Sequence, residues 1–272
     1  MGAYEKRMLL VQGDYPVEEE KLKLLKERFA FVYPYSCLEQ LYTKTTVSEL
    51  KIAAMAEKDE AAFHTFEEPE VVPYIPAFKR EKEEVTGTVR GNAYHRVMEL
   101  LDFEAVLGKD VTESFEAYVE QTDWAAVADR FRESMAKQTE CLRLAKEYAE
   151  CIRPERILEL LRSPLGYRMW RAHQDGLLHR EQPFVLGLPA SRVNSAFPEE
   201  EQVLIQGIID VFFEEDGELV LLDYKTDSVP TLQALWDRYE TQLDYYQEAL
   251  EKLTGKKVKE RILYSFHLGK YE

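Results

Sequence analysis

Cysteine is scarce in this sequence, and its few cysteines are not spaced like metal ligands. The 272 residues contain three, Cys37, Cys141 and Cys151, without any CxxC spacing. An odd number of scattered cysteines indicates neither a disulfide framework nor a zinc site. We therefore expect all three to be ordinary reduced thiols.

Long apolar runs and a nucleotide-binding loop are lacking too. No apolar stretch approaches the roughly 18 residues that a membrane span needs, and no basic-then-apolar signal segment follows Met1. We therefore expect a soluble, cytoplasmic protein. The P-loop string GxxxxGK[ST] does not occur, so we expect no ATP site in this chain.

Basic residues are outnumbered by acidic ones. The chain has 35 Lys and Arg against 51 Asp and Glu, a formal net charge of −16. This balance argues against a protein that coats nucleic acid by bulk electrostatics, but it leaves room for a local DNA channel. With 45% hydrophobic residues, the chain can bury the core of one large domain or of a domain with a helical elaboration.

The stretch from Gly207 to Asp227 predicts two strands joined by a tight turn at Asp216-Gly217, because apolar runs flank this strong turn dipeptide. A turn centred there places Asp210 directly across from Asp223. Opposed residues on neighbouring strands have Cβ atoms about 4.5 to 5.5 Å apart, close enough for two carboxylates to share a cation.

Side chains alternate between the two faces of a strand, so Asp210, Asp223 and Lys225 are expected on one face of this hairpin. Buried charges are costly unless they are paired or bound to a metal. Two interpretations stay open. Lys225 forms a structural salt bridge to either aspartate, or the three residues form a functional site.

The stretch GNAYHRVMELLDF predicts an amphipathic helix, with an apolar stripe at helical spacing that begins at Tyr94. His95 lies at the edge of the stripe, and Gly91 lies one turn earlier on the same side. There the missing side chain would let another backbone or a ligand approach. From the residues alone, His95 is either a core histidine or a functional one.

The remaining pattern predicts a mixed sheet flanked by helices. The expected strands are Leu177–Leu188, Val203–Phe213, Leu219–Lys225 and Arg261–Phe266. A helix is expected near Thr46 to Lys51 and another from Leu232 to Leu253, which Gly255 ends. Residues 111–173 are helical by pattern, broken at Arg153-Pro154 and Ser163-Pro164. Five apolar residues of this region are expected in the core: Trp124, Phe131, Leu142, Tyr148 and Ile152.

Several polar residues near these strands allow two interpretations each. Glu181, the conspicuous acid of the first strand, either approaches a metal or bonds to a neighbouring helix. The stripe Tyr239, Gln242 and Tyr246 on the later helix is either packing surface or part of a site. Three arginines near the start of the sheet form either a basic lip for phosphate or a solvated face: Arg168, Arg171 and Arg180.

At these residues the sequence resembles the PD-(D/E)XK nuclease superfamily, whose core hairpin carries an acid and then an acid-x-Lys. The matching elements are Asp210 and Asp223-Tyr224-Lys225. The longer string GIIDVFF…LVLLDYKTD, with GNAYH upstream and QLDYY downstream, resembles the RecB-type nuclease domain of AddA, the helicase–nuclease component of AddAB. This resemblance extends over essentially the whole chain.

The resemblance implies an α/β (α+β) fold with a restriction-endonuclease-like core, in which helices flank a central mixed sheet. It divides the chain into N-terminal helices and a linker over residues 1–84, leading from a helicase part, and a nuclease domain over residues 85–272. The helical stretch at about 111–173 would be an insertion in that domain.

The resemblance also implies site residues and a cofactor. The implied catalytic residues are Asp210, Asp223 and Lys225, and the implied ligands of Mg²⁺, or of Mn²⁺, are His95, Asp210, Asp223 and Tyr224. Gln242 and Tyr246 are implied to contact substrate. Glu181, Gly91 and Tyr239 receive no firm role. Some RecB-type nucleases add a four-cysteine iron–sulfur cluster, but three cysteines are too few, so no iron–sulfur cluster is expected.

The implied function is a metal-dependent DNA exonuclease domain of an AddA-like ATP-dependent helicase/nuclease, acting in double-strand break repair and recombination. The implied partners are DNA ends, or single strands behind a motor, the helicase part of the same protein, and an AddB-type subunit. Two alternatives stay open. One is an inactive nuclease-fold module that binds AddB or DNA, and the other is a free-standing PD-(D/E)XK repair nuclease.

Overall fold

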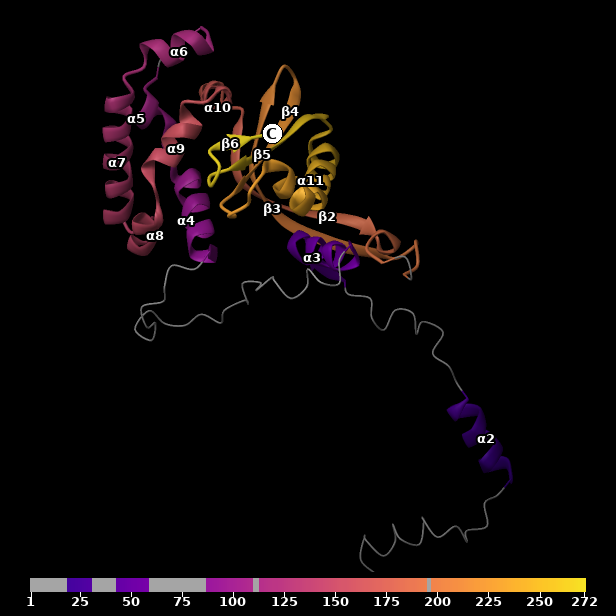
Figure 1. Ribbon diagram of the computed structural model, residues 1–272. Coiled ribbons are helices and arrows are strands. Elements are labelled where there is room, and N and C mark those ends of the chain that lie inside the picture. Colours follow the sequence, from indigo (N-terminus) through magenta and orange to yellow (C-terminus); the bar gives the residue numbers. More distant parts are fainter. Residues whose placement is uncertain (1–18, 31–42, 59–86, 110–112, 195–196) are drawn as a thin grey trace, which may run out of the picture.

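A computed structural model describes residues 19–30, 43–58, 87–109, 113–194 and 197–272 of the chain (Figure 1). Its centre is a six-stranded mixed sheet in the order β1-β3-β4-β5-β6, with β2 also paired to β3. The strands are β1 (Lys44–Thr46), β2 (Leu178–Pro189), β3 (Gln202–Glu215), β4 (Glu218–Lys225), β5 (Val258–Ser265) and β6 (Lys270–Tyr271). The four predicted strands correspond to β2 to β5. Strands β1 and β6 are too short to show an alternating pattern in the sequence.

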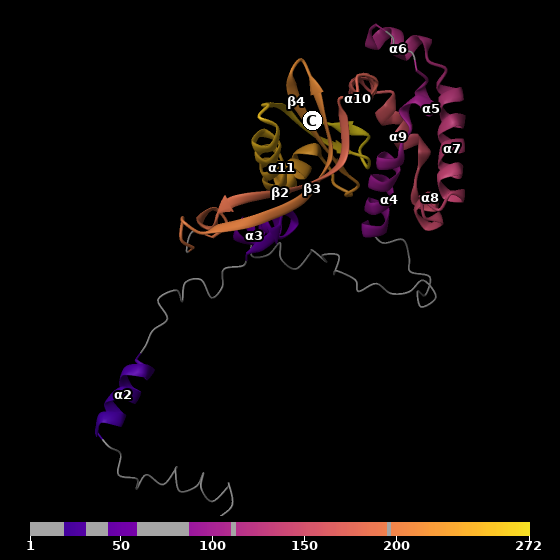
Figure 2. The same cartoon turned by 180° about the vertical axis from the view of Figure 1, so that it is seen from behind.

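Helices cover both faces of the sheet, as Figures 1 and 2 show from opposite sides. The layer on one face contains α4 (Gly87–Leu100), α5 (Phe103–Leu107), α6 (Phe115–Gln121), α7 (Trp124–Glu140), α8 (Lys146–Cys151), α9 (Pro154–Leu161) and α10 (Pro164–Gln174). The other face carries α3 (Val47–Lys58) and α11 (Leu232–Thr254). The remaining helix, α2 (Glu19–Phe29), has no buried residue. No helix in the described part of the chain is both long and apolar enough to cross a membrane.

Alternation along β3 and β4 separates two hydrophobic cores. Val211, Phe213 and Leu222 pack with the layer of helices α4 to α10. Phe212 and Leu221 pack on the opposite face, in the core that includes α3 and α11. Because both faces are covered there, β4 is buried at every residue after Glu218, and β3 is buried without interruption from Ile209 to Phe213. The predicted mixed sheet between helices is thus confirmed.

The helical layer breaks where its prolines predict. Helices α9 and α10 begin at Pro154 and Pro164, and the Ser163 hydroxyl caps the second by accepting the Gly166 N–H at 3.2 Å. Four of the five expected core residues are buried or partly buried in this layer. The prediction for Leu142 was wrong. It is 91% exposed with φ of 58°, because it follows the end of α7 in a left-handed conformation.

Gly166 lies where α9 and α10 touch, and this contact leaves no room for a side chain. A Cβ added there would lie 2.2 Å from the Leu160 carbonyl oxygen and 2.6 Å from that of Leu161. Because backbone must move to relieve the clash, Gly166→Ala is expected to destabilise the protein by about 3 kcal/mol in urea unfolding. Gly87→Ala is the matched control, since its Cβ meets nothing within 4 Å. Equal urea midpoints for Gly166→Ala and Gly87→Ala would contradict the close packing of α9 on α10 at Gly166.

Strand β3 has one edge divided between two partners. Strand β2 pairs along β3 from Gln202 to Phe213 and so occupies one edge. Strand β1 pairs in parallel with Leu204–Gln206, and β4 pairs in antiparallel fashion from Val211 onward, so both lie on the other edge. Residues 207–210 of β3 therefore face a gap between β1 and β4, and Asp210 lies at the β4 end of this gap.

The described segment 43–58 belongs to the sheet and to its helical cover. Strand β1 and helix α3, which lie in the segment predicted to precede the nuclease domain, pair with β3 and pack on α11. The predicted division near residue 84 lies outside the described residues, as does Cys37, and the division stays a prediction. Cys141 and Cys151 are free thiols.

Candidate metal centre and cleft

The β3–β4 hairpin has the predicted register. Glu215 pairs with Glu218, and the pairing continues to Val211 and Leu222. At the turn, Asp216 and Gly217 have φ of 57° and 83°, as a two-residue hairpin loop requires. Asp210 and Asp223 are the next residues along each strand. There the regular pairing ends, and Asp210 Oδ2 accepts the Tyr224 N–H at 2.8 Å.

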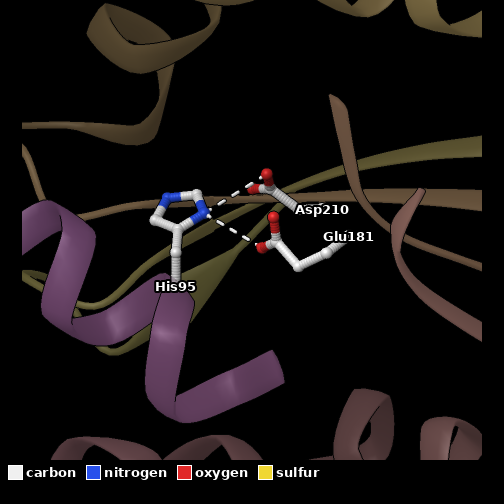
Figure 3. Close-up of side chains that lie close together, drawn as sticks. All are labelled: His95, Glu181 and Asp210. Atoms are coloured by element: carbon white, nitrogen blue, oxygen red, sulfur yellow. Dashed lines mark ion pairs between the residues drawn. The ribbon is translucent and has the colours of Figure 1, made fainter. Parts of the chain in front are cut away.

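Three potential metal ligands meet at the gap in the sheet. His95 Nδ1 of α4 lies 3.2 Å from Asp210 Oδ1 of β3 and 3.8 Å from Glu181 Oε1 of β2. Figure 3 shows both carboxylates directed at this one ring nitrogen. One ligand atom from each residue lies within 4.8 Å of the other two. The two residues predicted as metal ligands, His95 and Asp210, therefore lie together, and Glu181 lies beside them. We call these three residues the metal group.

Glu181 reaches this group through an unusual backbone. Its φ is 47°, in the left-handed region, although Arg180 and Gln182 on either side keep the same register with β3. A non-glycine residue in this region costs on the order of 1–3 kcal/mol and is often found at functional sites. Its contact with His95 of helix α4 is compatible with both interpretations of Glu181, a bond to a neighbouring helix and an approach to a metal.

Arg180 anchors β2 to the helix that carries His95. Its Nη1 donates to the carbonyl oxygens of Met98 and Leu101 at the end of α4, at 3.0 and 2.6 Å. Arg168 donates to Glu215 and Glu260, and it lines a surface pocket together with Arg171. Arg180 and Arg168 therefore hold elements of the fold together, and a phosphate contact by Arg168 or Arg171 stays a prediction.

Asp223 and Lys225 form a buried ion pair beside the metal group. Lys225 Nζ lies 2.6 Å from Asp223 Oδ2, and the Asp223 side chain is fully buried. Gln242 of α11 donates from Nε2 to Asp223 Oδ1 at 3.1 Å and to Tyr246 Oη at 3.0 Å. The salt bridge considered from the sequence is thus present, and it lies within the candidate site. Gln242 and Tyr246 support Asp223, and their contact with substrate stays a prediction.

The pKa values of the site follow from burial and from these close charges. Burial opposes protonation of His95, but the charge and hydrogen bond of Asp210, with help from Glu181, raise its pKa to about 10. Burial also opposes the charge of Lys225, but Asp223 raises its pKa well above the usual range. This shift favours the protonated form of Lys225, in which it offers a positive charge.

For Asp223, the effect of burial on the pKa is larger than the effect of its lysine partner. Burial raises its pKa to about 6, and Asp210 adds to this increase, while Lys225 lowers it. The negative charge of Asp223 thus depends on its lysine partner. Removing Lys225 would leave a buried carboxylate without a counter-charge.

A cleft of about 530 Å³ lies next to the candidate site. It is lined by His95, Asp210 and Lys225, by Gly91 and Arg90 of α4, and by residues of α3 and α11. A Cβ added at Gly91 would meet only Thr226 Oγ1, at 3.4 Å. Gly91 therefore leaves open space at the cleft, and no backbone of this chain packs closely against it. The contribution of α3, which was not predicted from the sequence, comes from Ser48, Lys51 and Ile52.

Comparisons with known proteins give a family match and several related proteins. The family described as the PD-(D/E)XK nuclease superfamily matches residues 71–270. A subunit of an ATP-dependent helicase/nuclease from Clostridium botulinum (strain 657) is 33% identical over 271 residues, which are 98% of this chain and 19% of that protein. The corresponding subunit from Lachnoclostridium phytofermentans is 32% identical, over 91% of this chain and 22% of that protein. The chain therefore spans about a fifth of the length of these curated relatives.

Proposed function

Because the chain belongs to the PD-(D/E)XK nuclease superfamily, we propose that its cleft is a metal-dependent nuclease site that hydrolyses phosphodiester bonds of DNA. One observation carries the proposal. His95, Glu181 and Asp210 offer ligand atoms within 4.8 Å of one another, and His95, Asp210 and the buried Lys225 line an open cleft.

The ligand set fits a hard or borderline divalent cation. Two carboxylates suit Mg²⁺, and the added imidazole suits Mn²⁺. We assign the cation to His95, Glu181 and Asp210. When bound, it would polarise the scissile phosphate and lower the pKa of an attacking water. Ligation by Asp223 and by Tyr224 stays a prediction, because the Asp223 carboxylate contacts Lys225 and Gln242 here.

Lys225 and Asp223 act together in this proposal. Asp223 keeps Lys225 charged and in place, and Gln242 keeps Asp223 in place. The fixed ammonium group faces the cleft, where it would stabilise the negative charge that develops on the phosphate oxygens. Its raised pKa favours this role as a positive charge.

The similarity to these helicase/nuclease subunits suggests the larger protein to which this activity belongs and the process in which it acts. We propose that the chain is the nuclease part of an AddA-like protein, an exonuclease that acts on DNA ends in double-strand break repair and recombination. A helicase part of the same protein and an AddB-type subunit would be its partners. Cleavage by this chain alone should then be weak or distributive.

The test is cleavage of end-labelled oligonucleotides by the purified chain. We expect cleavage with Mg²⁺ or Mn²⁺ and none with EDTA. A chain that binds DNA but cuts in neither ion would support the inactive module instead. Complete, processive degradation by the chain alone would support a free-standing repair nuclease.

Glu181 gives a second test, because the sequence left its role open. Glu181→Gln keeps the shape of the side chain but removes its charge, so Mn²⁺ affinity in calorimetry is expected to fall about 10- to 100-fold. Glu199→Gln removes the same charge from an exposed position in the β2–β3 loop and should leave the affinity unchanged. If both variants bind Mn²⁺ equally well, Glu181 is not a ligand.

A further inference from the structure

We propose that Lys51 of α3 binds a phosphate of the DNA strand, next to the phosphate that Lys225 contacts, so that α3 forms one wall of the DNA-binding cleft. This inference rests on the proposed nuclease function and adds a residue to its substrate site.

The sheet places α3 beside the metal group. Strand β1 ends at Thr46, which pairs with Gln206, and α3 begins at the next residue. This is the edge of β3 on which residues 207–210 face the gap. The start of α3 therefore lies only a few residues of β3 away from Asp210, although the two are far apart in the chain.

A capping box fixes the position where α3 begins. The Thr46 N–H donates to Glu49 Oε2 at 2.8 Å, and the Glu49 N–H donates to Thr46 Oγ1 at 3.2 Å. The Thr45 hydroxyl also donates to Glu49 Oε2, at 2.8 Å. Lys51 follows in the next turn and lines the cleft together with Ser48. A helix that is fixed at its first turn and packs on α11 can hold Lys51 at a defined place.

Lys51 and Lys225 contact the same aromatic ring. Their Nζ atoms lie 4.7 and 4.2 Å from the centroid of Tyr239, so the two ammonium groups are at most about 9 Å apart. Two positive charges at this separation can contact one phosphodiester or two successive ones. The ring holds both ammonium groups by cation–π contact at the wall of the cleft.

The electrostatics of the cleft favour an anion at this place. Burial lowers the pKa of Lys51, and the charge of Lys225 lowers it further, while Asp227 and Asp223 act in the opposite direction. Asp227 is itself bound to Arg238 and to the Tyr239 hydroxyl. A phosphate between the two lysines would relieve the repulsion between them. This local pair of cations also contrasts with the net charge of −16 for the whole chain.

Binding of a fluorescent single-stranded oligonucleotide tests the proposal, measured by anisotropy in EDTA at several salt concentrations so that no cleavage occurs. Lys51→Gln is expected to weaken binding about tenfold and to reduce the slope of log K against log salt by about 1. Lys51→Arg should restore both. Lys137→Gln, on the exposed face of α7, removes the same charge outside the cleft and should change neither.

The outcomes separate this proposal from the nuclease function. If Lys51→Gln matches Lys137→Gln in affinity and slope, Lys51 is not a phosphate contact, even if the unaltered chain cuts DNA with Mn²⁺. If the unaltered chain does not cut but Lys51→Gln still weakens binding, the nuclease proposal fails and the role of Lys51 stands. A chain that binds no oligonucleotide at low salt would overturn the role of Lys51. Urea unfolding of Lys51→Gln should match that of the unaltered chain, and a large loss of stability that Lys51→Arg does not restore would instead assign Lys51 to packing.

Discussion

Asp210→Asn is expected to remove cation binding and DNA cleavage together. Asp210 connects helix α4 with strand β4, because its Oδ1 lies 3.2 Å from His95 Nδ1 and its Oδ2 accepts the Tyr224 N–H. Asparagine keeps the shape and one acceptor, but it lacks the charge that a divalent cation requires. Single-turnover cleavage should fall by at least about 10³-fold, and Mn²⁺ binding in calorimetry should become undetectable.

Asp129→Asn is the matched control for this substitution. Asp129 is exposed on α7 and pairs with Arg132 of the same helix, so its loss should affect neither measurement. Cleavage by Asp210→Asn at the rate of Asp129→Asn would show that the cation, or the nuclease itself, lies elsewhere.

Lys225→Met is expected to separate cation binding from catalysis. The variant keeps the three metal ligands but loses the positive charge in the cleft, so Mn²⁺ affinity should stay close to that of the unaltered chain. The cleavage rate should fall by about 10² to 10³, the usual loss when one preorganised electrostatic contact is removed. Lys259→Met is the control, because Lys259 pairs with Glu215 and Asp216 near the hairpin turn. If Lys225→Met cuts like Lys259→Met, Lys225 is only a structural partner of Asp223.

The same variant should change the pH dependence of stability. Burial already raises the pKa of Asp223 to about 6, above its usual value of 3.8, and loss of Lys225 should raise it further. A carboxyl group with a raised pKa in the folded state favours folding at low pH, and this contribution is lost as pH rises through that pKa. The free energy of unfolding of Lys225→Met should therefore decrease more steeply between about pH 5 and pH 8 than that of the unaltered chain. If the free energy of unfolding changes with pH in the same way in Lys225→Met and in the unaltered chain, Asp223 and Lys225 do not form a buried ion pair.

The sequence predicted those features of the site that follow from local pattern. Alternating residues around Asp216-Gly217 determine the hairpin register, so the neighbouring positions of Asp210 and Asp223 could be predicted. The apolar stripe of α4 placed His95 at the edge of a helix that packs on the sheet. Both inferences use periodicities of two or 3.6 residues, which a single sequence displays.

Other features depend on contacts that leave no such pattern. Glu181 joins the metal group through a left-handed backbone inside a strand, a conformation that no residue type in this strand indicates. Lys51 reaches the cleft because β1, only three residues long, pairs with β3 far along the chain. A strand of this length has too few residues to show alternation, so the helix near Thr46 to Lys51 could be predicted but its position beside the cleft could not.

Diffraction from a crystal soaked in Mn²⁺ tests the central claim most directly, because the anomalous signal locates the ion itself. We expect a peak bonded to His95, Glu181 and Asp210 at the gap between β1 and β4, and no such peak in crystals of Asp210→Asn. A crystal with fully occupied Mn²⁺ elsewhere and none at these three residues would contradict the proposed metal centre.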